Sequence, residues 1–174
     1  NVEVNYSWEY GASFSASQEL QAMASGWYET GTEIIFACGG SMFQSVAAAA
    51  SANDAAVVGV DVDQSFESDT VVTSAMKGLT PTVKHMLSEV VAGNFANYGG
   101  KIDTLGLVSA NPEENYVQIP TASTQFEDGK FTQADYKALV KAMFDGTLTV
   151  SNDITKSAAD FATVITVDDQ GKIK

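Results

Sequence analysis

The sequence contains little positive charge and almost no cysteine or histidine. Lysine and arginine number 9 against 22 acidic residues, which gives a formal net charge of −13. This balance argues against nucleic-acid binding, which requires clustered basic side chains, and against electrostatic attachment to an anionic bilayer. No segment approaches the ~18 consecutive apolar residues that a membrane-spanning helix needs. Hydrophobic residues nevertheless reach 45%, so the composition indicates a globular chain.

The only cysteine and the only histidine each exclude a class of site. Cys38 cannot form an internal disulfide framework or a zinc site of several thiolates. It ends an apolar segment, so we interpret it as a small buried hydrophobe. His85 lies beside the apolar face of a predicted helix with no nucleophile motif near it, which favours a surface or structural histidine. The sequence therefore predicts no catalytic histidine, no metal site and no cofactor.

The length of 174 residues is that of one domain. The chain starts at Asn1 with neither a methionine nor an apolar secretory segment, so we expect that a preceding segment is missing.

Strand-like and helix-like patterns alternate in the first half. Short apolar runs predict strands at residues 2–6, 33–38, 56–60 and 71–74, the second of them covered on both faces. Helical spacing of apolar residues predicts helices between them, one from the N-cap Ser15 to Gly31 and one over residues 42–51. This alternation predicts an α/β fold, mainly a parallel sheet with helices on both faces.

The second half follows a different pattern. Thr80 as N-cap and Pro81 in the first turn predict a helix that ends at Gly93. Its predicted inward face consists of Val83, Met86, Leu87, Val90 and Val91. A second helix is expected from Thr132 to Gly146. Short strands are predicted at residues 104–108, 116–119 and 162–167.

Three polar or glycine clusters directly follow predicted strands, where ligands bind in open α/β sheets. Gly39-Gly40-Ser41 comes first, and it is either a backbone cradle for a ligand at a helix N-terminus or a tight turn. Lys77 comes last, and it either joins a carboxylate and a ligand hydroxyl or is simply solvated.

Asp61 and Asp63 form the middle cluster. Such carboxylates can accept hydrogen bonds from the two hydroxyls of a sugar or ribose. The alternatives are an exposed acidic loop, a glycosidase pair or a hard-cation site, although a calcium loop needs more oxygen donors than this segment supplies.

Aromatic side chains lie close to the N-terminus. Phe14 either stacks on an aromatic ligand or belongs to the core, and the same alternatives stay open for Trp8 and Tyr10.

Three segments together resemble a known family. They are residues 34–41 (IIFACGGS), 58–64 (VGVDVDQ) and 71–77 (VVTSAMK), and Ser13-Phe14-Ser15 adds to the likeness. In this order and spacing they resemble the basic membrane protein family, the purine-nucleoside-binding lipoproteins of ABC transporters. The resemblance covers roughly residues 1–150.

The resemblance implies a type I periplasmic-binding-protein fold, in which two α/β lobes close on a ligand. It also implies that Phe14 stacks on the nucleobase and that the backbone of Gly39 and Gly40 faces the ligand. Asp61, in preference to Asp63, and Lys77 would then hold the ribose hydroxyls. The implied partner is an ABC permease, and the implied location is the cell surface, outside the cytoplasm, with a lipid anchor.

Two departures from the family pattern qualify this reading. The N-terminal lobe is missing, and so is the lipid-bearing cysteine, since Cys38 lies inside a predicted strand. We therefore expect residues 1–174 to form a single domain, largely the C-terminal lobe of a two-lobed protein. Such a chain is expected to bind nucleoside weakly or not at all and to self-associate through its uncovered face.

The sequence thus predicts a solute-binding component of an ABC importer and not an enzyme. A binding protein for a sugar or another small polar ligand is the nearest alternative. An α/β nucleoside or glycoside hydrolase using Asp61 and Asp63, and a ligand-sensing domain, are the others.

Overall fold

The computed structural model describes residues 3–8 and 14–172. The chain divides into two compact units, one made of Asn1–Ser15 with Val150–Lys174 and the other of Ala16–Thr149. Val2, Tyr10 and Ser13, which the sequence analysis singled out, lie outside the described residues. That the whole chain is largely one lobe of a longer protein stays a prediction.

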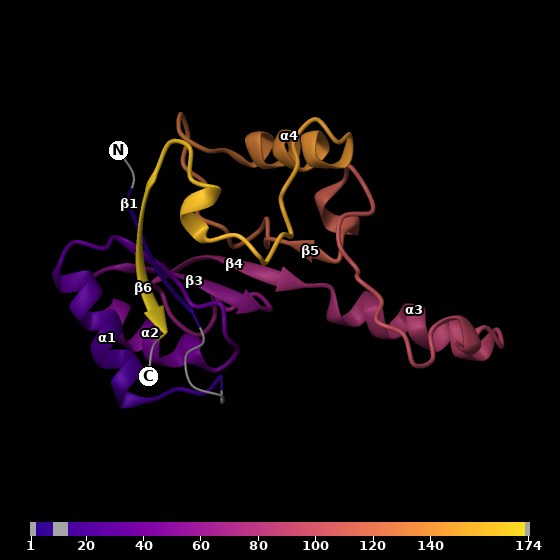
Figure 1. The fold of residues 1–174 in the computed structure, drawn as a ribbon, viewed down its shortest axis with the longest axis horizontal. Coiled ribbons are helices and arrows are strands. Elements are labelled where there is room, and N and C mark those ends of the chain that lie inside the picture. The colour runs from indigo at the N-terminus through magenta and orange to yellow at the C-terminus, as the bar shows by residue number, and fades with distance from the viewer. Residues whose placement is uncertain (1–2, 9–13, 173–174) are drawn as a thin grey trace. The chain divides into compact units, whose positions relative to one another are not determined.

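The larger unit is built on a four-stranded sheet with the order β2-β3-β4-β5 (Figure 1). The strands β2 (Ile34–Phe36), β3 (Ala56–Asp61) and β4 (Val71–Lys77) are parallel, while the short β5 (Val117–Gln118) is antiparallel. Helix α1 (Gln18–Glu29) precedes β2, and α2 (Met42–Ala52) connects β2 to β3. The predicted α/β fold with a mainly parallel sheet is therefore confirmed.

The core of this unit lies where α1 packs on α2 and α2 packs on β3. Phe43 is only 1% exposed, and Leu20 and Val57 are also buried. The Tyr28 hydroxyl donates a hydrogen bond of 2.7 Å to the Ala56 carbonyl oxygen, which fastens α1 to β3. Burial raises the pKa of Tyr28 to about 12.

The start of α1 corrects one prediction. The N-cap is Ser17 and not Ser15, because the Ser17 side chain accepts a hydrogen bond from the Leu20 backbone N–H. The Ser17 N–H donates to Ser45 Oγ at 2.8 Å, and Ser45 Oγ donates to the Ser17 carbonyl oxygen at 2.9 Å. This link between α1 and α2 fixes where the helix begins.

Strand β2 and the turn after it correct two further predictions. Ile35 is buried, but Ile34 and Phe36 are exposed, so this outermost strand is covered on one face and not on both. The strand ends at Phe36, and the Cys38 N–H then donates to the Phe36 carbonyl oxygen. Cys38 is therefore exposed in a turn, where the prediction had it buried in a strand.

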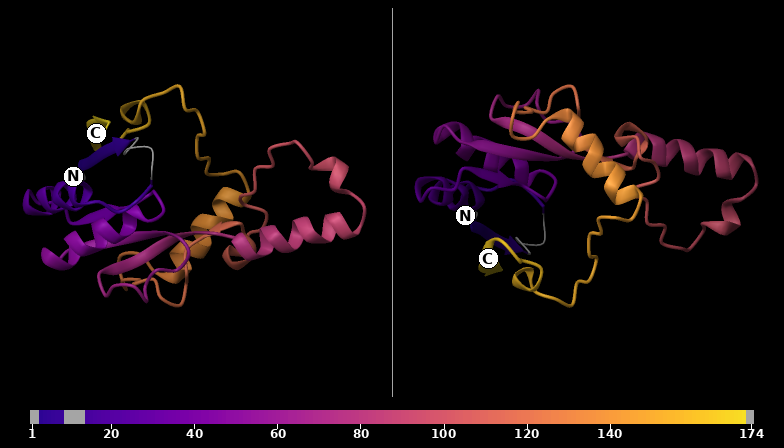
Figure 2. Two further views of the ribbon diagram at one scale, coloured as in Figure 1. Left: turned by 90° about the horizontal axis from the view of Figure 1, so that it is seen from below. Right: turned by 90° about the horizontal axis from the view of Figure 1, so that it is seen from above.

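Helix α3 (Leu79–Val91) forms where it was predicted, but its apolar stripe is not buried. Leu87 is 59% and Val91 88% exposed, and no residue of this helix is buried. In Figures 1 and 2, α3 continues beyond the end of β4 and projects away from the sheet. The N-cap is Gly78 and not Thr80. The Gly78 N–H donates to the Tyr116 carbonyl oxygen at 2.7 Å, so the junction is tied to the chain before β5.

The segment between α3 and β5 contains less strand than expected. Residues 104–108 form no strand, and β5 has two residues. The side chain of the buried Asn115 holds this segment together in place of hydrogen bonds between strands. Its Oδ1 accepts from the N–H groups of Val108 and Ser109, and its Nδ2 donates to the carbonyl oxygens of Ser109 and Asn111. The 3-10 helices η1 (Phe95–Asn97) and η2 (Pro112–Glu114) also lie in this region.

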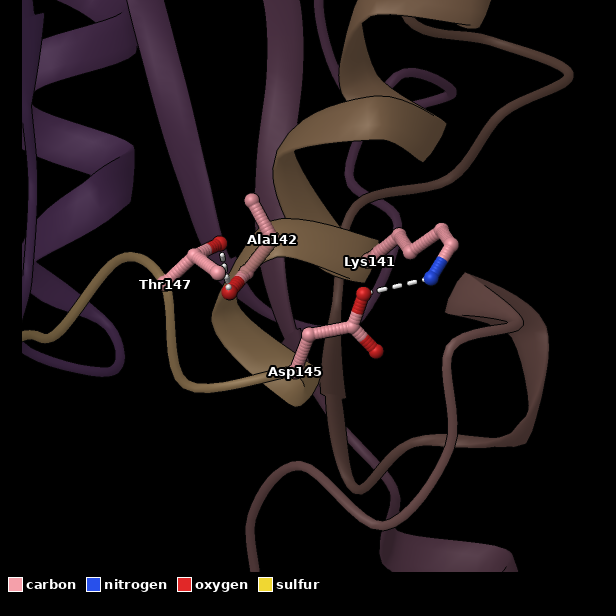
Figure 3. Close-up of polar contacts among 4 residues, drawn as sticks. All are labelled: Lys141, Ala142, Asp145 and Thr147. Carbon is pink, nitrogen blue, oxygen red and sulfur yellow. Dashed lines mark hydrogen bonds and ion pairs between the residues drawn. The ribbon is translucent and has the colours of Figure 1, made fainter.

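Helix α4 (Gln133–Phe144) confirms the predicted start at Thr132, which forms a capping box with Asp135. Tyr136 and Val140 are buried, whereas Leu139 and Phe144, which have the same helical spacing, are exposed. At the other end, Lys141 and Asp145 form an ion pair, and Thr147 Oγ1 donates to the Ala142 carbonyl oxygen at 3.0 Å (Figure 3).

The smaller unit contains β1 (Glu3–Trp8), β6 (Thr166–Lys172) and the 3-10 helix η3 (Ala158–Asp160). The two strands pair in parallel, with Glu3 opposite Thr166. The predicted strand at residues 162–167 is therefore shifted toward the C-terminus. Among the residues with a described position, no helix is long and apolar enough to cross a membrane.

Candidate ligand site at the ends of the parallel strands

The sheet brings three of the predicted site segments to the same edge. Phe36 of β2 lies opposite Val58 of β3, and Asp61 at the end of β3 lies opposite Met76 of β4. The strands are parallel, so the Gly39-Gly40 turn, Asp61 and Lys77 all follow carboxyl ends on this edge. Ligands of open α/β folds bind there.

Asp61 and Lys77 form an ion pair at this edge. Lys77 Nζ lies 2.6 Å from Asp61 Oδ1, and the two side chains are 64% and 34% exposed, respectively. Contact with the Asp61 side chain, and then its negative charge, raise the pKa of Lys77 above the usual 10.5. Asp61 Oδ1 is shielded from solvent and has no well-aligned hydrogen bond within the described residues. The attraction between the opposite charges of Asp61 and Lys77 therefore holds the two side chains together.

The backbone at Asp61 has an unusual conformation. Its φ angle is +69°, and the Val62 N–H donates to the Val60 carbonyl oxygen at 2.8 Å. These features define a γ-turn centred on Asp61, a turn that is rare and strained for a residue with a side chain. Strain of this kind is found mostly at functional sites, where the surrounding structure maintains it.

Asp63 has a different environment from Asp61. Its carboxylate accepts hydrogen bonds from the Ser65 N–H at 3.0 Å and from Ser123 Oγ at 2.7 Å. Partial burial raises the pKa of Asp63, but the hydrogen bonds from Ser123 and Ser65 outweigh it, so that the pKa lies below the usual 3.8. A glycosidase pair needs one carboxyl that stays protonated near neutral pH. Asp63 is held ionised and Asp61 is paired with Lys77, so this pair of carboxyls does not favour hydrolysis.

Gln64, to which the sequence analysis gave no role, lies close to Asp61 in the chain and contacts both β3 and β4. It is only 8% exposed, its Oε1 accepts from the Val60 N–H at 2.7 Å, and its own N–H donates to Ser74 Oγ at 3.0 Å. It thus connects β3 with β4 directly beneath the Asp61 turn. The available signal was its place at the end of the segment VGVDVDQ, but burial of a glutamine cannot be read from that position.

The Gly39-Gly40-Ser41 segment forms a tight turn. Gly40 has a φ of +54°, which suits glycine. The N–H groups of Met42 and Phe43 donate to the carbonyl oxygens of Gly39 and Gly40, and the Gly39 N–H donates to Ala37. These N–H groups of the turn and of the first turn of α2 are therefore already used. A role of the Gly39 and Gly40 backbone in binding stays a prediction.

Within the described residues, the remaining candidates have no hydrogen bond or ion pair with the ligand-site carboxylates. Phe14 belongs to the smaller unit and is exposed with a φ of +47°, so its stacking role stays a prediction. His85 contacts the edge of the Tyr98 ring, with 5.7 Å between the ring centroids. Cys38 is close enough to Lys77 to affect its pKa. Over residues 3–8 and 14–172, no group of three or more His, Cys, Asp or Glu could hold a metal ion.

Comparison with solved structures shows which known fold the chain resembles. The chain is similar to a solute-binding protein of an ABC transporter system from Conexibacter woesei DSM 14684, with a TM-score of 0.54 and 24% sequence identity. The alignment covers 76% of this chain and 41% of that one, so the present chain spans less than half of that protein. A search of curated proteins found no match.

A comparison with protein families gives a match that covers more of the sequence than the structural alignment does. Residues 1–150 match the family described as ABC transporter substrate-binding protein PnrA-like. This match includes all three segments at the edge of the sheet and most of the chain. The chain therefore belongs to the PnrA-like family of ABC transporter substrate-binding proteins.

Proposed function

We propose that this chain is part of the substrate-binding component of an ABC importer and that its ligand is a purine nucleoside. The observation that carries the proposal is the ion pair of Asp61 and Lys77 at the ends of parallel strands, in a chain of the PnrA-like family. The chain covers only 41% of the solved relative, so we propose that it corresponds largely to one lobe of a two-lobed protein.

The chemistry of the pair suits a neutral ligand with neighbouring hydroxyls. An ionised carboxylate can accept two hydrogen bonds from a ribose diol, and a lysine ammonium can donate to the same hydroxyls. The two formal charges cancel, so the pair does not select for an anion or a cation. Phe14, as an exposed aromatic ring, supplies the flat surface that a nucleobase needs for stacking.

The proposed role contains no bond-breaking step. Ligand binding shifts the equilibrium between open and closed arrangements of a two-lobed receptor, and the closed form delivers the ligand to the permease. Location outside the cytoplasm and attachment through a lipid anchor are further parts of the proposal. Because this chain supplies only part of the ligand contacts, we expect its own affinity to be weak, with a Kd on the order of 1 mM.

Self-association of this chain is a separate proposal. Five apolar side chains of α3 are exposed, namely Leu79, Val83, Leu87, Val90 and Val91. Exposed apolar surface of this kind favours association. Analytical ultracentrifugation over a range of concentrations is expected to show a rising average mass, and a constant monomer mass would contradict it.

The ligand can be tested by saturation-transfer NMR with the 174-residue chain. Inosine, guanosine and adenosine are each added, with free adenine, ribose and glucose as comparison ligands. We expect signals for the nucleosides that are lost in Asp61→Asn and Lys77→Met, since each removes one charge of the pair. Lys130→Met is the matched control, because Lys130 forms an exposed ion pair with Glu127 of similar length, 2.8 Å.

The other possible outcomes distinguish the proposed receptor from its alternatives. Nucleoside signals that persist in both site variants would show that the pocket lies elsewhere. A signal from glucose or ribose alone would favour the sugar-binding alternative. Release of free base or free sugar during incubation would identify a hydrolase and contradict the receptor proposal.

A further inference from the structure

We propose that Gln64 is a positioning residue of the ligand site, which acts through the γ-turn at Asp61 and touches no ligand itself. Its effect on ligand affinity rests on the proposed function, whereas its effect on the Asp61–Lys77 pair does not.

The side chain of Gln64 reaches back to the strand that carries Asp61. Its Oε1 accepts from the N–H of Val60, the residue directly before Asp61, at 2.7 Å. The carbonyl oxygen of that same Val60 accepts the hydrogen bond from the Val62 N–H that closes the γ-turn. Gln64 therefore holds the peptide unit between Gly59 and Val60, and the hydrogen bond of the turn joins the two peptide units on either side of Asp61.

Gln64 is itself held firmly in place. Its N–H donates to Ser74 Oγ at 3.0 Å, and Ser74 is completely buried in β4. Gly59 makes room for this contact, since a Cβ there would lie 2.6 Å from Ser74 Oγ and 2.9 Å from Gln64 Oε1. A buried amide that is hydrogen-bonded at both its backbone and its side chain cannot change position without losing these bonds.

Asp63, the residue directly before Gln64, is a second anchor of the same loop. Asp63 accepts from Ser123 Oγ at 2.7 Å and from the Ser65 N–H at 3.0 Å, which ties the loop to the segment after β5. The two anchors are consecutive residues of the short loop directly after the γ-turn, and Asp61 is left as the residue that reaches Lys77. This arrangement explains how a strained φ of +69° is maintained at a residue with a side chain.

The test measures Lys77 and needs no ligand. The lysine side chains are labelled with ¹³C at Cε, and the pKa of Lys77 is followed by NMR in the parent chain, in Asp61→Asn and in Gln64→Ala. Asp61→Asn defines the Lys77 pKa without the ion pair. We expect Gln64→Ala to lower the Lys77 pKa most of the way to that value, because the carboxylate is no longer aimed at the ammonium.

A merely structural role would leave the Lys77 pKa unchanged in a folded variant. Gln44→Ala, at an exposed glutamine of α2, is the matched control and is expected to keep the parent value. Cys38, which also acts on Lys77, is present in every variant. A folded Gln64→Ala variant with the parent pKa overturns the proposal, and if this variant does not fold, Ser74→Ala is judged by the same criterion.

Ligand binding separates this inference from the proposed function. If the parent chain binds nucleoside, Gln64→Ala is expected to weaken binding about tenfold, the scale of one lost charged hydrogen bond. If the parent chain binds no nucleoside but Gln64→Ala lowers the Lys77 pKa, nucleoside binding by this chain is contradicted and the positioning role of Gln64 stands.

Discussion

Helices α2 and α3 both carry the apolar residues that a buried helix needs, but only one of them is buried. Six residues of α2 are buried, among them Phe43, Val46 and Ala50, and the helix packs on α1 and β3. No residue of α3 is buried, although Val83, Leu87 and Val90 recur at helical spacing. The sequence pattern thus specifies which face of a helix is apolar, and the surrounding chain decides whether anything covers it.

The hydrogen bonds of the sheet and of the exposed helix α3 also differ. Around β3 and β4, Gln64, Ser74 and Asp63 are joined by hydrogen bonds between elements. In α3, the Thr82 and Ser88 hydroxyls donate to the carbonyl oxygens of Gly78 and His85, which belong to the helix or its N-cap. We therefore expect the sheet with α1 and α2 to be the stable part of the larger unit and α3 to contribute little to it.

The largest expected effect is on stability, at matched apolar positions of the two helices. Phe43→Ala, at a side chain that is 1% exposed, is expected to lower the free energy of unfolding by about 3–5 kcal/mol, because it leaves a cavity. Leu87→Ala in α3 is expected to change it by less than about 0.5 kcal/mol. Urea unfolding followed by circular dichroism measures both, and similar losses would show that α3 is covered in solution.

Amide hydrogen exchange provides the second comparison. An isolated helix of about 13 residues is marginally stable in water, so the α3 amides are expected to exchange on the order of 100-fold faster than those of β3. Mass spectrometry of peptides from residues 56–61 and 79–91 measures the difference. Equal protection at low protein concentration would contradict the view that the described chain leaves the residues of α3 uncovered.

The third comparison uses two glycines with different surroundings. Gly59→Ala places a Cβ 2.6 Å from Ser74 Oγ and is expected to cost about 1–3 kcal/mol, because the packing between β3, β4 and Gln64 must open. Gly26→Ala in α1 meets no atom within 4 Å and is expected to stabilise the chain by about 0.5–1 kcal/mol. Thermal unfolding gives both values, and a neutral Gly59→Ala would show that the contact beneath Asp61 is loose.

The smallest effect concerns acid stability. The folded state lowers the pKa of Asp63 below 3.8, so its contribution is present above that pH and is lost as the pH falls through the lower, folded value. Ser123→Ala removes one hydrogen bond and is expected to shrink this contribution, with a loss of about 0.5–1.5 kcal/mol at neutral pH. Unfolding measured at pH 3 and pH 7 tests this: the gap between the variants should narrow at pH 3.

Much of the larger unit could be predicted from the sequence because local signals and packing agree there. The strand at 56–60, the helix at 42–51 and the Thr132 cap were all expected and are present. Ser15 and Thr80 were plausible caps by residue type, but the contact of Ser17 with Ser45 and the tie of Gly78 to Tyr116 fixed different starts. Such long-range contacts leave no local signal.

The site was predictable in part for the same reason. Residues that follow parallel strands meet at one edge, so Asp61 and Lys77 could be expected close together, and they are. The separation of the two aspartates could not be read from the sequence, because Asp63 binds Ser123, sixty residues further along. Nor could the role of Gln64, since its burial depends on Gly59 and Ser74 from two strands.

The most direct test of the central claim, a ligand site at the carboxyl ends of β3 and β4, is chemical-shift mapping with inosine. Backbone amides of the ¹⁵N-labelled chain are followed as inosine is added at millimolar concentrations. The account predicts that the largest shifts lie at Gly39, Gly40, Asp61 and Lys77, and that 2′,3′-dideoxyinosine, which lacks the diol, produces none of them. Shifts confined to α3 or α4, or equal shifts with both ligands, would contradict it.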